Sequence, residues 1–361
     1  MKSSILSTIR NYIPLEKKGD VYRGYCPFHK GSEPLFYVHP HKQVFHCFGC
    51  GEKGDASDFL KKFFSLDTAA VEQIIATQNN EKTYTTFWYR INTNVTKMYQ
   101  NFLHSNEGTP GYQYLKKERG LGDDTISKFC LGYAPGKDTI YDYIKHINLN
   151  CINCDYGLIN LDAEKGKHDR FYNRVIFPIF DVSNNVIGFG GRVIGEQKPK
   201  YLNTKDNTIF HKRDNLYALN WAVNSHHNGF LLCEGYMDVI SLHQAGFDNA
   251  VASLGTAFTK EQAKKLACYR DTIYLAYDSD AAGQNACERA ISIADEVGLK
   301  TRVISLDPFK DPDELIKALG SAGFNQRILT SAGGHMYMIN KKANNEEDIK
   351  ETAANYLIQL K

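Results

Sequence analysis

Short apolar runs alternate with amphipathic stretches between residues 229 and 318, and this is the clearest pattern in the chain. Each run has the length of a β-strand and ends at a polar residue or a glycine, and the stretches between the runs have the length of helices. The expected strands are 230–233, 250–254, 272–277 and 301–306. Strands that alternate with helices in this way predict a parallel sheet with helices packed on it.

The helices of this region also have recognisable ends. Thr259 and Gln262 have the spacing of a capping box, which predicts the start of the second helix. Glycines end the first and third helices. In parallel sheets, ligands bind outside the carboxyl ends of the strands. Glu234 and Asp278 directly follow two of the expected strands, so both are candidate site residues.

The rest of the chain has weaker patterns. The N-terminal part contains short strand-like runs around a cluster of cysteines and histidines, and a polar stretch separates it from helical spacing at about 87–105. A mixed α+β region follows, and the C-terminal residues look helical. The predicted division is a domain at 1–78, a linker at 79–86, a mixed subdomain at 87–228, an α/β domain at 229–320 and a helical tail at 321–361.

Length and composition indicate a multidomain globular protein. The 361 residues are more than one hydrophobic core usually supports, and the hydrophobic content of 42% is within the globular range. No run of about 18 apolar residues exists, and the N-terminus lacks the features of a signal peptide. We therefore expect a cytoplasmic protein with no membrane partner. In that compartment, the nine cysteines favour metal ligands or buried thiols over disulfides.

The charge is unevenly distributed, although the net charge is only +2. Residues 165–213 contain ten Lys or Arg against four Asp or Glu, whereas residues 307–314 are mainly acidic. A basic tract beside an acidic one suits a polyanion path that leads to a metal site. The alternative reading is two solvated faces, and charge alone does not decide between them.

Two ligand pairs predict a metal site near the N-terminus. Cys26 and His29 form the first pair. Cys47 and Cys50 form the second, and seventeen residues separate the pairs. Thiolate and imidazole ligands suit tetrahedral zinc, and four protein ligands leave no open position, so we expect one structural zinc ion. His46 is excluded, because on a strand it would point away from the neighbouring Cys47.

Aromatic and basic residues surround these ligands. They are Tyr25, Phe28, Phe36, Tyr37, Phe45 and Phe48, with Lys30, His41 and Lys42. Aromatic side chains interleaved with bases can stack nucleobases and hold phosphates. A small zinc domain also needs aromatic side chains for its core, and for each single ring the core is the favoured role.

Acidic residues at strand ends predict a second, different metal site. Asp278 and Asp280 follow one strand, and Glu234 follows another. An acidic stretch at 311–314 follows the last strand. Parallel strands lie about 5 Å apart, so carboxylates at neighbouring strand ends can share a divalent cation. Oxygen ligands suit Mg²⁺ or Mn²⁺, and two such ions can activate an attacking hydroxyl and stabilise a leaving oxygen. Alternatively, these acids are solvated helix caps, and Asp280 could be an N-cap.

Three sets of motifs, in one order along the chain, resemble a single family. The zinc cluster, the basic tract and the acidic strand ends resemble the zinc domain, the RNA-polymerase domain and the Toprim domain of bacterial and phage primases of the DnaG type. The motifs lie at 45–51, 114–115, 119–121, 131–133, 174–179, 188–193, 199–203, 234–240, 253–257, 278–283 and 311–314. The resemblance covers roughly residues 20 to 320.

The resemblance implies a DNA primase, an enzyme that makes short RNA primers on single-stranded DNA from ribonucleoside triphosphates. Glu234, Asp278 and Asp280 would hold two or more catalytic Mg²⁺ or Mn²⁺ ions. The supporting acids would be Asp238, Asp311 and Asp313. The zinc domain would recognise the template. The residues implied for binding nucleic acid or nucleotide are Arg174, Arg192, Lys200, Tyr201, Asn203 and Lys212.

The chain departs from the family pattern in two ways. Before Pro34 the zinc domain lacks the charged Glu-Lys pair that family members usually carry, so the preferred template sequence is expected to differ. No Walker-type phosphate-binding loop occurs, and the segment after Gly320 is short. We therefore expect no helicase motor and no helicase-docking domain, so that a replicative helicase would be reached only through another protein. The chain would be either truncated or a compact primase of a phage or mobile element.

Two other functions fit parts of the pattern. A zinc-plus-Toprim mediator of recombination would bind DNA without polymerising nucleotides, but it would not need the complete acidic trio or the central basic motifs. Topoisomerases and nucleases also use Toprim domains. A topoisomerase needs a large strand-passage region, for which 361 residues leave little room.

Overall fold

The computed structural model describes residues 5–10, 13, 15–29, 33–63, 81–146, 157–162, 166–255, 257–343, 348–349 and 352–353. The chain forms two compact units. One comprises Met1–Trp88, Lys137–Cys154 and Leu158–Arg170, and the other comprises Tyr89–Gly136, Asp155–Gly157 and Phe171–Lys361. No helix in the described part of the chain is long and apolar enough to cross a membrane.

A small antiparallel sheet dominates the N-terminal part of the first unit. Its strand order is β1-β2-β3-β4-β5. Alternate residues of the two central strands face inward, among them Phe36 and Phe45, and they pack with Phe59 of α2. This alternation is the two-residue period that the strand-like runs predicted. The elements are α1 (Ile5–Arg10), β1 (Glu16–Lys18), β2 (Val21–Gly24), β3 (Phe36–His39), β4 (Val44–Cys47), β5 (Lys53–Gly54) and α2 (Ala56–Phe63).

A helix and a hairpin from the middle of the sequence also belong to the first unit. They are α7 (Thr139–His146), β7 (Ile159–Asp162) and β8 (Gly166–Asp169). Asp169 is buried, and its carboxylate accepts hydrogen bonds from the backbone N–H groups of Ile140 and Tyr141. These are orphan donors in the first turn of α7, so Asp169 stabilises the start of that helix.

The second unit begins with helices and a four-stranded antiparallel sheet of order β11-β10-β9-β6. The helix predicted at about 87–105 begins earlier, at Glu81, so part of the predicted linker is helical. Hydrophobic spacing misses such first turns, because their sequence is mostly polar and shows no apolar period. The elements are α4 (Glu81–Leu103), of which the part from Tyr89 belongs to this unit, η1 (Asn106–Gly108), α5 (Thr109–Gln113), η2 (Tyr114–Glu118), α6 (Asp123–Lys128), β6 (Gly132–Ala134), β9 (Arg174–Phe180), β10 (Val186–Val193), β11 (Tyr201–Asn203), η3 (Lys212–Asp214) and α8 (Leu219–Ala222).

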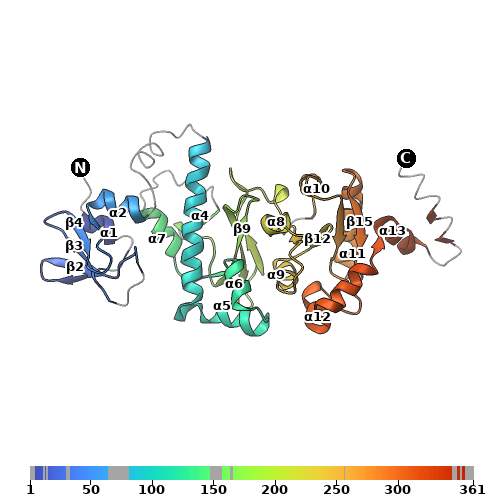
Figure 1. Ribbon diagram of the computed structural model, residues 1–361, viewed down its shortest axis with the longest axis horizontal. Helices are drawn as coiled ribbons and strands as arrows, with labels where there is room; N and C mark the ends of the chain where they lie inside the picture. The colour runs from blue at the N-terminus through green and yellow to red at the C-terminus, as the bar shows by residue number, and fades with distance from the viewer. Residues whose placement is uncertain are drawn as a thin grey trace. The chain divides into compact units, whose positions relative to one another are not determined.

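The predicted parallel sheet forms the rest of the second unit, and Figure 1 labels two of its strands, β12 and β15. Its strand order is β13-β12-β14-β15-β16. The first four strands are parallel, and β16 pairs antiparallel with β15. All four predicted strands are present, and the last three end two or three residues earlier than expected. The elements are β12 (Phe230–Cys233), α9 (Tyr236–Gln244), β13 (Ala250–Ala252), α10 (Lys260–Ala267), β14 (Thr272–Leu275), α11 (Ala281–Asp295), β15 (Lys300–Val303), α12 (Pro312–Leu329), β16 (Ala332–Gly333) and α13 (Gly334–Lys342).

The expected helical tail is partly a continuation of the Toprim-like region. Helix α12 passes the predicted boundary at 320 with a break at Gly320, whose φ of 64° only glycine adopts readily. The short strand β16 then joins the sheet before α13. The sequence did not predict this strand, because two residues are too few to show a period. Much of the tail beyond 343 lies outside the described residues.

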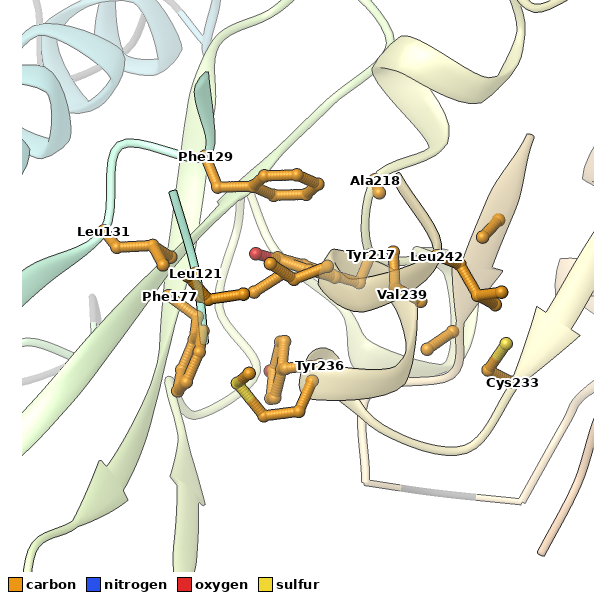
Figure 2. Packing of buried hydrophobic residues seen from close by; sticks show 14 of the residues in the cluster. Leu121, Phe129, Leu131, Phe177, Tyr217, Ala218, Cys233, Tyr236, Val239 and Leu242 are labelled. Atoms are coloured by element: carbon orange, nitrogen blue, oxygen red, sulfur yellow. The ribbon is translucent and has the colours of Figure 1, made fainter. Parts of the chain in front are cut away.

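One hydrophobic core joins the antiparallel sheet to the parallel sheet. Phe177 of β9 stacks on Tyr236 of α9 with ring centroids 4.9 Å apart, and Tyr217 meets the same ring edge-on at 4.7 Å (Figure 2). The two faces of β12 are both buried, since Leu231 contacts this core and Leu232 contacts the core under α10 and α11. The acidic strand ends and the basic strands are therefore held in one packed body.

Candidate active site and metal centres

Two of the predicted catalytic acids lie side by side at the carboxyl ends of neighbouring strands. Glu234 follows β12 and Asp278 follows β14, and these strands pair directly. The backbone N–H of Asp278 donates to Oε1 of Glu234 at 3.2 Å. The parallel topology thus brings together two carboxyl groups that are 44 residues apart in the sequence.

Three further acids each use one oxygen to cap a helix. Asp280 accepts from the N–H of Gly283 at the start of α11, and Asp311 accepts from the N–H of Glu314 at the start of α12. Asp238 accepts from the N–H of Gly235 at the start of α9. The capping role considered for Asp280 is therefore present. It leaves the second carboxylate oxygen of each residue without a hydrogen bond among the described groups.

Gly283 allows α11 to approach the acidic strand ends. A Cβ atom at this position would lie 2.2 Å from the carbonyl oxygen of Asp278 and 2.9 Å from Oε1 of Glu234. The first distance involves backbone, so any side chain would push the helix away. The glycine in the 278–283 motif therefore sets the spacing between α11 and the two strand-end acids.

The acids crowd negative charge into a partly buried place. Burial and, after it, the charges of Glu234 and Asp311 together raise the pKa of Asp278 to about 6, against the effect of Lys310. Burial, with the charge of Asp280, also raises the pKa of Glu234. Burial and the neighbouring acids raise the pKa of Asp238 well above its usual range. Such a set of oxygen donors lacks positive charge, and a divalent cation of the Mg²⁺ class would supply it.

The sixth predicted acid, Asp313, has different surroundings. It is 4% exposed, and its Oδ2 lies 3.0 Å from Nη1 of Arg119 and 2.9 Å from Nζ of Lys317. Its Oδ1 accepts a hydrogen bond from the hydroxyl of Ser241. Both of its oxygens therefore already have partners within the protein.

The four predicted zinc ligands converge in the first unit. The ligand atoms of Cys26, His29, Cys47 and Cys50 all lie within 4.8 Å of one another, and no other group of three or more His, Cys, Asp or Glu side chains in the described residues is as close. The sulfurs of Cys26 and Cys50 are 3.7 Å apart, and the Cys47 sulfur is 3.8 Å from Nδ1 of His29. Tetrahedral ligands about 2.3 Å from a zinc ion would be about 3.8 Å apart, so the set fits zinc.

A second glycine, Gly49, leaves the space that the His29 ring of this cluster occupies. A Cβ atom at Gly49, between the two cysteines of the second pair, would lie 2.6 Å from Nε2 of His29. Burial raises the pKa of the Cys26 thiol to about 12, although the N–H of Phe28 donates to its sulfur. A bound cation would favour the thiolate instead.

The structure divides the aromatic residues of this domain into two groups. Phe28, Phe36 and Phe45 pack against one another and against Phe59 in the core, as favoured for each ring. The other group lies outside the core. Phe48 is 63% exposed, and its ring is 4.3 Å from that of His46 and 5.5 Å from that of Tyr37; Tyr25 is also exposed.

Two of the six residues implied for nucleic-acid binding point into the protein. Arg174 is 6% exposed and donates to the carbonyl oxygens of Gly191, Pro199 and Lys200. Asn203 donates to the carbonyl of Leu254 and accepts from the hydroxyl of Tyr236. Both side chains fix the backbone that carries their neighbours.

Of the other four, Lys200 and Tyr201 are exposed, and Arg192 and Lys212 are half-buried. Arg192 on β10 lies opposite Tyr201 on β11, with Lys200 just before it, and we call these three residues the basic face. The Arg192 guanidinium is 4.2 Å from the ring centroid of Tyr114 and 5.9 Å from that of Tyr201, while its Nε is buried without a hydrogen-bond partner among the described atoms. Lys212 lies in η3, 4.0 Å from Asp206.

The sequence assigned no role to two residues that the structure places beside the basic face. Tyr114 and Arg119 occur in motifs that marked only the start of a domain. Arg119 donates to the Tyr114 hydroxyl and lies over the same ring at 5.3 Å. No sequence signal could have revealed their place beside the basic face, because Arg192, whose guanidinium lies over the Tyr114 ring, comes from a distant segment of the chain.

Comparisons with known proteins cover nearly the whole chain. Residues 1–88 match the CHC2 zinc finger family, residues 98–223 match the N-terminal domain of the DNA primase catalytic core, and residues 231–316 match the Toprim-like family. The DNA primase of Clostridium acetobutylicum is 38% identical over 363 residues, which cover 95% of this chain and 60% of that protein.

Solved structures agree with this. The zinc-binding and RNA polymerase domains of the Aquifex aeolicus primase superpose with a TM-score of 0.70 at 33% identity, covering 99% of this chain and 90% of that one. A DnaG primase catalytic domain bound to single-stranded DNA gives a TM-score of 0.64 at 35% identity, covering 70% of this chain and 81% of that one. The chain spans about 60% of the length of the first curated relatives that it matches.

Proposed function

Because this chain belongs to the DnaG-type DNA primase family, we propose that it synthesises short RNA primers on single-stranded DNA. The family and the fold class predicted from the sequence are confirmed. The observation that carries the proposal is the pair of strand-end acids, Glu234 and Asp278, held in a packed body with the basic face. Oxygen donors for a cation and side chains for phosphates are both needed to join nucleotides.

The proposed reaction is nucleotidyl transfer. The 3′-hydroxyl oxygen of one nucleotide attacks the α-phosphorus of an incoming ribonucleoside triphosphate, the bond to the β-phosphate oxygen breaks, and pyrophosphate leaves. Glu234, Asp278 and Asp280 would hold Mg²⁺ or Mn²⁺, with Asp238 and Asp311 in support. When bound, these cations would activate the hydroxyl and neutralise charge on the transferred phosphate. The protein itself would contribute mainly positioning.

The basic face would bind phosphates of template, primer or nucleotide. Arg192 and Lys200 are cations without an acidic partner among the described ion pairs, and Tyr201 offers a ring for stacking. Lys212 would add a further phosphate contact. Single-stranded nucleic acid is commonly held by this combination of charge and stacking.

The zinc domain would recognise the template. The exposed ring of Phe48 and the half-buried rings of Tyr37 and His46 form one group and suit the stacking of unpaired bases. The zinc ion itself would be structural, because the quartet uses all four positions of a tetrahedral shell.

The direct test is primer synthesis. Purified protein is incubated with single-stranded DNA, labelled ribonucleotides and Mg²⁺ or Mn²⁺, and the products are separated on a denaturing gel. We expect short, template-dependent RNA that disappears when RNase is added. DNA binding without any product would support a recombination mediator instead, and relaxation of supercoiled plasmid would support a topoisomerase.

Metal analysis tests the zinc assignment separately. We expect one zinc ion per chain, and its loss in Cys50→Ala but not in Cys268→Ala, which changes an exposed cysteine outside the quartet. Structural zinc contributes roughly 10–16 kcal/mol of apparent binding at neutral pH. Removal by a chelator should therefore unfold the zinc domain and leave the parallel-sheet region folded, as circular dichroism and limited proteolysis would report. Zinc-free reduced protein with an intact N-terminal domain would contradict the assignment.

A further inference from the structure

We propose that Asp313 is a positioning residue that holds Arg119 beside the basic face, and that it does not bind a catalytic cation. This inference rests on the proposed function, because it assigns roles within the same site. It separates Asp313 from the other five acids, with which the family resemblance groups it.

The partners of Asp313 occupy both of its carboxylate oxygens. The Arg119 and Lys317 cations both lie at about hydrogen-bond distance from Oδ2, and the Ser241 hydroxyl donates to Oδ1. A carboxylate at 4% exposure with these three donors already has its charge balanced. A divalent cation would have to displace an arginine to bind it, which would leave that guanidinium without its acidic partner.

The other acids provide the contrast. Glu234, Asp278 and Asp280 form no ion pair among the described residues. Glu234 and Asp280 each accept a hydrogen bond only from backbone, and the Asp278 carboxylate accepts none from the described groups. A cation gains most where negative charge lacks a partner, and that is at the strand ends and not at Asp313.

The contacts of Arg119 connect Asp313 to the basic face. Its Nε donates to the hydroxyl of Tyr114, whose ring also lies against the guanidinium of Arg192 at 4.2 Å. A continuous chain of contacts therefore runs from Asp313 through Arg119 and Tyr114 to Arg192. Asp313 lies on α12 of the parallel-sheet region, so this chain fixes the basic face relative to the acidic strand ends.

Metal binding and substrate binding distinguish the two roles. Mn²⁺ binding to the full chain is followed by electron paramagnetic resonance, and template affinity is followed by fluorescence anisotropy with labelled single-stranded DNA. We expect Asp313→Asn to bind Mn²⁺ within about twofold of wild type and to bind template about tenfold more weakly, as for the loss of one charged hydrogen bond. Asp278→Asn should give the opposite pattern. A loss of Mn²⁺ affinity in Asp313→Asn as large as that in Asp278→Asn would overturn the proposal.

A double-mutant cycle tests whether Asp313 acts through Arg119. Arg119→Gln should weaken template binding as Asp313→Asn does, and the double variant should be no weaker than Arg119→Gln alone. Multiplied losses would mean that the two residues act independently and would refute the link. If Asp313→Asn does not fold, Arg119→Gln still decides the matter: unchanged template affinity would end the proposal.

Lys317→Gln is the matched control. It removes the other cation at Oδ2, whose own side chain is 44% exposed and forms no other ion pair or hydrogen bond among the described residues. Its template affinity should stay within about twofold of wild type, because Lys317, unlike Arg119, has no contact with Tyr114 or Arg192 among the described residues. A tenfold loss in this control would assign the effect to general charge around Asp313 and would also count against positioning. Failure of the proposed function would appear separately, as absence of primer synthesis in wild type.

Discussion

Single carboxylates in this protein combine a structural and a chemical role. Asp280 and Asp311 each stabilise the start of a helix with one oxygen, and the other oxygen accepts no hydrogen bond from the described groups and is left for the proposed cation. A hydrogen-bonded cap fixes the side chain, so little conformational entropy is lost when a cation binds. The helix-cap and metal-ligand readings of the sequence are thus compatible, since they use different oxygens of the same group.

Neutralising a strand-end acid should reduce activity without reducing the stability of the fold. We predict that Asp278→Asn reduces primer synthesis about 100-fold or more, the usual effect of losing one preorganised charge. Burial raises the pKa of Asp278 to about 6, so at pH 8 the ionised form is disfavoured by folding. The variant should therefore melt at the same temperature as wild type or higher in metal-free buffer at that pH.

Asp271→Asn is the control for this substitution. Asp271 precedes the same strand at its opposite end, where it is exposed and paired with Lys300. Both activity and melting temperature should stay near wild type. Normal turnover by Asp278→Asn would contradict a role of the Asp278 charge in activity. A lower melting temperature would show that folding does not disfavour this charge.

Asp169 should make the first unit sensitive to pH. Burial raises its pKa to about 7, even though the N–H groups of Ile140 and Tyr141 favour the charged form. The folded pKa lies above the unfolded value of 3.8, so the folded state binds the proton more tightly. The contribution of Asp169 to the free energy of unfolding is largest below about pH 4. It falls as the pH rises to about 7, and above that it no longer changes with pH.

The measurement is denaturant unfolding of wild type and Asp169→Asn at several pH values from 4.5 to 8. The slope attributable to one proton approaches about 1.4 kcal/mol per pH unit between the two pKa values. Other groups titrate equally in both proteins, so the difference between the two curves isolates Asp169. Parallel curves across this range would show that the hydrogen bonds outweigh burial and that the carboxylate stays charged.

At the scale of elements, helix α10 fixes the turn that carries Lys212. Gln262 is fully buried, and its amide donates to the carbonyl oxygens of Lys212 at 3.0 Å and Asn215 at 2.7 Å. Its own oxygen accepts from the N–H of Thr259, completing the capping box that the sequence predicted. One side chain thus caps its own helix and orders the neighbouring turn.

We predict that Gln262→Leu destabilises the fold by about 1–3 kcal/mol, because two buried carbonyls lose their donor. Template binding should also weaken, since Lys212 loses its ordered position. Glu261→Gln, at the neighbouring position, is the comparison, because it breaks only the exposed ion pair of Glu261 with Arg213. Equal template affinity in the two variants, measured on folded protein, would mean that η3 keeps its conformation without Gln262.

The sequence predicted which elements exist better than where they end. Leu254, Leu306 and Tyr277 lie beyond the strands assigned to them, yet all three are buried. Hydrophobic pattern reports burial, whereas a strand end is set by the last ladder hydrogen bond, and the two differ where apolar residues continue into the core. The early start of α4 is the opposite case, because its first turns are mostly polar.

The candidate sites followed the same logic. The zinc quartet and the pair at Glu234 and Asp278 depend on short spacing or on strand topology, and both can be read from the sequence. The inward turn of Arg174 and the ion pair of Arg119 with Asp313 depend on packing between distant segments. Residue type shows that an arginine can bind phosphate, but only the fold shows what else it already contacts.

At the scale of the whole molecule, function depends on a charge distribution that the net charge of +2 conceals. Within the second unit, the shared core around Phe177 and Tyr236 keeps the basic strands and the acidic strand ends at a fixed separation. Like charges are thereby concentrated in two neighbouring places. In the proposed function, the nucleic acid would bind the basic place and divalent cations the acidic one. The molecule needs a rigid connection between these places more than it needs a large net charge.

This arrangement predicts a measurable salt dependence of template binding. The logarithm of affinity should fall linearly with the logarithm of salt concentration, and each phosphate contact on a single strand contributes about −0.7 to the slope. Replacing Arg192 and Lys200 together by alanine should remove two contacts and flatten the slope by about 1.4, while Lys300→Ala should leave it unchanged, since Lys300 pairs with Asp271 at the other end of the sheet. The test is fluorescence anisotropy at salt concentrations from about 50 to about 300 mM, a range in which affinity for nucleic acid changes strongly. Because the slope counts displaced counterions and not total affinity, a general loss of folding cannot imitate the result. An unchanged slope in the double variant would place the template path away from β10 and β11.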